Sequence, residues 1–197
     1  MNPRVVLTSK PVTLLGIIGP VIAMLAIAVA IALSPWFSFS DNALSDLGVS
    51  SVAAIFNWGL IICGAMMAPF ILGLWLRIAD GVRLRKVGLA LLFLAALALI
   101  GIGVFTEDSM DLHFFVSFAF FVLLLSGLLF FGVSTLADAE LRIIGIIAMV
   151  SVAIGMVAWA VDWGGVAIPE LLSAVPAMLV LIILAVKTYA WETTKRQ

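Results

Sequence analysis

The chain contains a single histidine, His113, and it stands in an acidic stretch, TEDSMDLHFFVSF, at positions 106–118. Three carboxylates lie within the six residues before it, and Ser117 follows it by four residues. Residues four apart in a helix share a face, so the imidazole and the Ser117 hydroxyl would be neighbours. This combination could form a hydrolytic site with histidine as the base, a ligand site, or only the wet end of a membrane helix.

Other polar side chains are expected at the same depth as His113 when residues are placed along helices with a rise of about 1.5 Å each. Asn57 lies a turn or more inside one apolar run. The set that falls in the outer third of the membrane, or just above it, is Asp46, Asn57, Asp111, His113, Ser117, Asp162, Glu170 and Ser173. The opposite half offers only weakly polar interior residues such as Ser126 and Ser151. We therefore predict a polar pocket that opens at one end of the protein.

The candidate residues divide into two roles. In a catalytic interpretation, His113 acts as general acid or base and is oriented by Glu170, Asp46 or Asp111. The ligand-binding candidates are Asn57, Ser117, Asp111, Asp162 and Ser173.

Each role has a structural alternative. A carboxylate in the first turn of a helix is favoured by the helix dipole, which would explain Asp111 and Glu170. Asn57 could simply join two helices, because an amide placed that deep needs a hydrogen-bond partner. Glu107 and Asp108 are interpreted as solvated loop charges.

The chain is poor in the residues that bind metals and prosthetic groups. Zinc sites usually use several histidines or cysteines, whereas this chain has one of each, His113 and Cys63. Haem held by two histidines is excluded within one such chain, and no loop has the spacing of a known calcium site. We predict no metal site, and the sequence leaves the cofactor unknown. No nucleotide motif or basic face is present, so nucleic acid is not an expected partner.

The composition defines the elements that must position these residues. The chain has 197 residues, of which 65% are hydrophobic and 11% charged, with a mean hydropathy of +1.32. A soluble domain is about half apolar and about a quarter charged, so lipid must be the solvent for most of this surface. Runs of about 20 apolar residues predict spanning helices, and they are too continuous for barrel strands, which alternate. We predict one all-α transmembrane domain over residues 1–197, a bundle of six helices at about 11–34, 52–76, 84–105, 112–133, 141–161 and 168–188.

The basic residues predict the orientation. All ten fall on one side of the predicted membrane: Arg4, Lys10, Arg77, Arg83, Arg85, Lys86, Arg142, Lys187, Lys195 and Arg196. The connections on the other side carry none. Because cytoplasmic connections are rich in lysine and arginine, both termini are predicted to be cytoplasmic in a multi-pass protein of the cell membrane.

Several stretches together resemble a known family. They are NALSDLG at 42–48, IFNWGLIICG at 55–64, DLHFFVSFAFF at 111–121 and IPEL at 168–171. In this order they are similar to the domain-of-unknown-function 998 family of archaeal and bacterial six-span membrane proteins. The resemblance marks Asp46, Asn57, His113 and Glu170, and it implies no activity. A more distant similarity, to six-span eukaryotic proteins of lipid remodelling and lysosomal membranes, adds a lipid-related role as an expectation.

Two functions remain open at this point. The first is an uncharacterised integral membrane protein, an accessory subunit or binding protein, whose polar pocket opens to the non-cytoplasmic side. The alternative is a lipid-modifying enzyme that uses His113 with a carboxylate. The expected partners are membrane lipid and other membrane-protein subunits.

Overall fold

The computed structural model describes residues 3–79 and 81–194, and six long helices dominate it. They are α2 (Lys10–Ala32), α3 (Ala53–Ile78), α4 (Arg83–Val104), α5 (Asp111–Thr135), α6 (Arg142–Ala160) and α7 (Ala167–Thr194). Each is long and apolar enough to cross a membrane, and no strand occurs among the described residues. The all-helical, six-span prediction is confirmed. Helices are favoured here because lipid offers no hydrogen-bond partner to the backbone.

Three short helices complete the fold. An α-helix, α1 (Pro3–Leu7), precedes α2, and two 3₁₀ helices, η1 (Leu44–Val49) and η2 (Glu107–Ser109), lie in connections. The connection at residues 33–52, which contains η1, is called the cap loop below.

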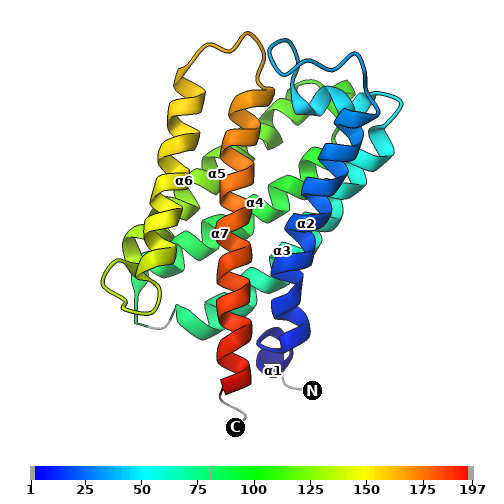
Figure 1. The fold of residues 1–197 in the computed structure, drawn as a ribbon. Helices are drawn as coiled ribbons and strands as arrows, with labels where there is room; N and C mark the ends of the chain where they lie inside the picture. The colour runs from blue at the N-terminus through cyan, green and yellow to red at the C-terminus, as the bar shows by residue number, and fades with distance from the viewer. Residues whose placement is uncertain (1–2, 80, 195–197) are drawn as a thin grey trace.

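The six long helices run alternately up and down and form a closed bundle (Figure 1). Each packs on its neighbours in sequence, and α7 also packs on α2 to close the bundle. Both termini lie at one end (Figure 1), which we call the basic end because the basic residues gather there. The opposite end carries the cap loop and connections 105–110 and 161–166, which contain no lysine or arginine; we call it the acidic end. Lys195 and Arg196, predicted for the basic side, lie outside the described residues.

Small residues bring the helices together. A Cβ at Gly88 of α4 would lie 2.6 Å from the backbone nitrogen of Phe131 in α5. A Cβ at Gly145 of α6 would lie 2.8 Å from the carbonyl oxygen of Gly132. Without a strong hydrophobic driving force between helices in lipid, such close backbone packing is a main source of bundle stability.

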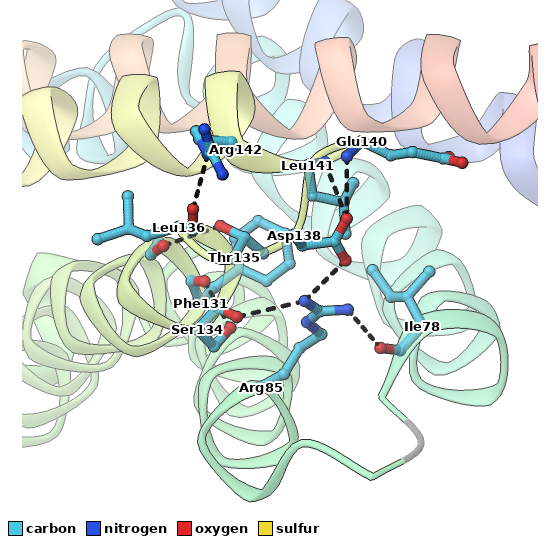
Figure 2. A network of polar contacts seen from close by, with 11 residues as sticks. Ile78, Arg85, Phe131, Ser134, Thr135, Leu136, Asp138, Glu140, Leu141 and Arg142 are labelled. Carbon is cyan, nitrogen blue, oxygen red and sulfur yellow. Dashed lines mark hydrogen bonds and ion pairs between the residues drawn. The ribbon is translucent and has the colours of Figure 1, made fainter.

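A buried ionic network fastens the basic end (Figure 2). Arg85 is 6% exposed. Its guanidinium donates to Asp138 Oδ2 at 3.0 Å, to the Ile78 carbonyl at 2.9 Å and to the Ser134 carbonyl at 3.3 Å. It thereby joins α3 and α4 to the connection between α5 and α6. The expectation that this half holds only weakly polar interior residues was wrong, because these three acceptors allow the Arg85 guanidinium to be buried.

Candidate functional site

The cap loop is tied to the bundle by hydrogen bonds from separate elements. The carbonyl oxygen of Asn42 accepts from the backbone N–H groups of Val166 and Ala167, at 3.2 and 3.0 Å. Glu170, in the first turn of α7, accepts from the Leu44 N–H through Oε2 at 2.7 Å. Both Leu44 and Glu170 are buried. The cap loop therefore closes the acidic end over the start of α7.

Asn57 holds the same loop to α3. Its Nδ2 donates to the carbonyl oxygen of Gly48 at 2.8 Å. A Cβ at Gly48 would lie only 2.6 Å from Asn57 Oδ1, so a larger residue here would displace the amide. The Asn57 amide therefore links α3 to the cap loop, as the structural alternative predicted.

Asp46 organises the loop from within. Its Oδ2 accepts from Asn42 Nδ2 at 2.7 Å and from the Ala43 N–H at 3.2 Å. The carboxylate satisfies a backbone donor at the start of η1, as side chains do at helix N-termini. Its charge also acts on Glu107 of η2.

Beneath the cap loop lies a cavity of about 820 Å³ between α5, α6 and the start of α7. This volume falls in the range of about 300–1,000 Å³ typical of small-molecule sites. Most of its lining is apolar: Ala43, Met110, Phe114, Phe118, Phe121, Val122, Leu125, Met156, Trp159, Ala160 and Val166. Its polar lining residues are Ser45, Glu107, His113, Ser117 and Glu170.

The cavity meets the outer surface of the bundle between α5 and α6. On the α5 side, Phe114 is 72% exposed and Phe118 is 60% exposed. On the α6 side, Met156 is 62% exposed. These side chains both line the cavity and reach the outer surface of helices that are long and apolar enough to span a membrane.

The hydrogen bonds of His113 fix the roles of its two ring nitrogens. Nδ1 lies 2.7 Å from the carbonyl oxygen of Phe105, and a carbonyl only accepts, so Nδ1 carries a proton and donates. Nε2 lies 3.3 Å from the Ser117 hydroxyl and accepts from it in the tautomer that carries its proton on Nδ1. The orienting partner is therefore a backbone carbonyl rather than one of the carboxylates proposed from the sequence.

Glu107 is part of the site, whereas the sequence interpretation made it a solvated loop charge. It lines the cavity, and its Oε1 accepts from the Ser45 hydroxyl at 2.8 Å. Burial, together with the neighbouring carboxyl of Asp46, raises the pKa of Glu107, although the hydrogen bond from Ser45 works in the opposite direction. The interpretation failed because the cap loop folds over η2 and shields this side chain.

The family model described as "Protein of unknown function (DUF998)" matches residues 17–187. The chain belongs to this family. The match covers most of the six spanning helices and agrees with the resemblance carried by the sequence motifs. No curated protein and no solved structure matches the chain.

The remaining predicted residues of this DUF998 protein lie outside the cavity lining. Asp111 is exposed in the first turn of α5. Asp162 is exposed and accepts from the Gly164 N–H at 3.0 Å, which stabilises the turn before α7. Ser173 is fully buried and accepts from Trp159 Nε1 at 3.0 Å, so it orients a lining residue from behind.

Sequence reasoning missed several lining residues of the DUF998 protein. Ser45 lies in the SDLG turn and could have been found from that motif. Trp159 and the phenylalanines of α5 look like ordinary lipid-facing residues in a sequence, and only the packing of α5 against α6 distinguishes them. Among the described residues, no group of three or more histidines, cysteines or acidic residues is placed to hold a metal ion.

Proposed function

We propose that this multi-pass membrane protein binds a membrane lipid or a similar amphiphile in the cavity between α5, α6 and α7. The observation that carries the proposal is the distribution of side chains along the cavity. Its walls are aromatic and aliphatic, and polar groups, of which Ser45, His113 and Glu170 are buried, gather beneath the cap loop at the acidic end. An amphiphile has the same division into an apolar chain and a polar head.

The position of the mouth supports entry from the lipid side. The chain of the ligand would pass between α5 and α6 along Phe114, Phe118 and Val122. Its head would meet the polar lining near Glu107 and Glu170. By the distribution of lysine and arginine, this end faces the non-cytoplasmic side, so the ligand would come from the outer leaflet.

A test of the proposal uses mass spectrometry of the protein released intact from nanodiscs of its native lipids. We expect a bound lipid on the wild-type protein and its loss in Ala160→Trp, which fills the cavity from α6. Ala153→Trp is the matched control, because Ala153 is exposed on the same helix and does not line the cavity. Equal lipid occupancy in both variants would contradict the proposal.

The same preparation tests the role of an accessory subunit. If the chain is a subunit of a larger complex, a second protein should co-purify with it in fixed proportion. Isolation of the chain with lipid but without a stoichiometric protein would restrict the proposal to a binding protein.

One observation favours a second function, hydrolysis of an acyl group. The Ser117 hydroxyl donates to Nε2 of a histidine whose tautomer is fixed by the Phe105 carbonyl, and both side chains line the cavity. A histidine in this position could accept the hydroxyl proton during attack on an ester. Labelling with a serine-directed fluorophosphonate tests this function. If the protein is a hydrolase, the wild-type protein should be labelled, Ser117→Ala should abolish the labelling and His113→Gln should strongly slow it. A wild-type protein that is not labelled would rule this function out.

A further inference from the structure

We infer that the cavity selects an amphiphile whose head carries an ammonium group, bound by the carboxylates of Glu170 and Glu107. This inference rests on the proposed binding function and names the chemical class of the ligand.

Glu170 provides a carboxylate oxygen that is free to bind. The residue is 9% exposed and lines the cavity. Its Oε2 accepts from the Leu44 N–H, while Oε1 has no hydrogen-bond partner among the described residues. A buried charge without a full set of partners is costly, and a ligand with N–H donors would satisfy this oxygen.

Glu107 places a second acceptor group beside the first. Its charge and that of Asp46 both act on Glu170. The like charges repel one another, and a positive group placed among them would remove that repulsion. The low local dielectric beneath the cap loop strengthens this attraction relative to water.

The cavity offers no basic side chain to hold an anion. The cavity lining contains no lysine or arginine, and none occurs in the three connections of the acidic end. Both ring nitrogens of His113 already have partners, the Phe105 carbonyl at Nδ1 and the Ser117 hydroxyl at Nε2. The indole N–H of Trp159 is occupied by Ser173. A head that is only a phosphate would therefore meet acceptors and like charge.

The head must supply most of the selectivity. An alkyl chain that moves from lipid to an apolar wall exchanges one apolar surface for another, so it contributes little preference. Trp159 lines the cavity, and an aromatic face can add attraction to a cation that lies over it.

The test compares probes of equal chain length on the protein in nanodiscs: dodecylamine, dodecanol and dodecyl phosphate. Binding is measured by displacement of a fluorescent alkyl probe. We expect dodecylamine to bind at least about tenfold more tightly than dodecanol, and dodecyl phosphate more weakly than either. Glu170→Gln keeps an acceptor for the Leu44 N–H but removes the charge, and it should remove most of the preference for dodecylamine over dodecanol, leaving only the part that Glu107 contributes. Asp111→Asn, which neutralises an exposed carboxylate of α5 outside the cavity, should leave the preference unchanged.

A fourth probe, dodecylphosphoethanolamine, carries its ammonium beyond a phosphate and separates two sources of the same chemistry. If it binds with an affinity that depends on Glu170, the ligand is an ethanolamine phospholipid. If only dodecylamine binds in a way that depends on Glu170, the ligand is a long-chain amine. Either result supports recognition of an ammonium group.

The possible failures are distinguishable. Equal binding of all probes, lost in Ala160→Trp, would overturn the inference about the head and leave the proposed lipid site standing. Binding that Ala160→Trp does not affect would overturn the proposed site itself.

Discussion

Glu170 both anchors the cap loop and lines the cavity, and two substitutions separate these roles. Glu170→Ala removes the acceptor of the Leu44 N–H, which is buried. A buried donor left without a partner costs about 1–3 kcal/mol. Because the 2.7 Å bond is short, we take about 2 kcal/mol. Glu170→Gln keeps an acceptor at this position and relieves repulsion from Glu107 and Asp46.

The assay is thermal unfolding in a mild detergent, followed by tryptophan fluorescence. A loss of about 2 kcal/mol lowers Tm by roughly 4–8 °C for a chain of this size. We therefore expect Glu170→Ala to unfold several degrees below the wild-type protein and Glu170→Gln to unfold within about two degrees of it.

Two results would refute this reasoning. If Glu170→Ala had the wild-type Tm, the bond to Leu44 would not hold the cap loop. If Glu170→Gln were as unstable as Glu170→Ala, the charge rather than the acceptor would be the stabilising feature.

Three further predictions follow from other contacts. Folding raises the pKa of Glu107, so the folded protein binds this proton more tightly than the unfolded chain, and the free energy of unfolding falls as pH rises from about 4.3 through the raised value. Glu107→Gln should therefore raise Tm at pH 8 but not at pH 4. A variant with the wild-type Tm at pH 8 would count against burial as the cause. Burial alone would raise the pKa of Asp138, but the hydrogen bond from Arg85 and two backbone N–H bonds lower it. The stabilisation that the Asp138 carboxylate contributes is therefore full above about pH 3.9 and is lost as pH falls through the lowered pKa. Asp138→Ala should lower the free energy of unfolding near neutral pH by about 1–2 kcal/mol, measured by denaturation. This is less than the loss of a fully buried pair, because Asp138 is 31% exposed and Arg85 keeps two carbonyl partners. A loss that persisted unchanged at pH 3 would contradict the ionic origin of the effect. Gly88→Ala should destabilise the bundle by about 1–3 kcal/mol, because the alanine Cβ would overlap Phe131. The control Leu97→Ala, which shortens an exposed side chain of α4, should change Tm little. Equal Tm values for the two variants would argue against close packing of α4 on α5.

The fold was largely predictable because a single physical requirement dominates it. A backbone in lipid must satisfy its own hydrogen bonds, so six apolar runs become six helices. The predicted first span at 11–34 corresponds to α2, Lys10–Ala32. The boundaries differ by a few residues because connections at the membrane surface obey local turn chemistry rather than hydropathy.

The candidate site was predictable only in part. Depth along a helix brought His113, Ser117 and Glu170 together, and all three line the cavity. Depth does not give rotation about the helix axis or the course of a connection. It therefore could not tell that Asn57 would bond to Gly48, or that the cap loop would bring Ser45 to Glu107.

The most direct measurement of the central claim is photo-crosslinking with a twelve-carbon alkylamine that carries a diazirine in its chain. The protein is labelled in nanodiscs, and the modified peptides are mapped by mass spectrometry. The proposed site predicts adducts concentrated on the facing surfaces of α5 and α6, at positions such as Phe118, Val122 and Met156, that an excess of unlabelled dodecylamine suppresses. Adducts spread evenly over the lipid-facing sides of α2 and α3, without competition, would contradict it.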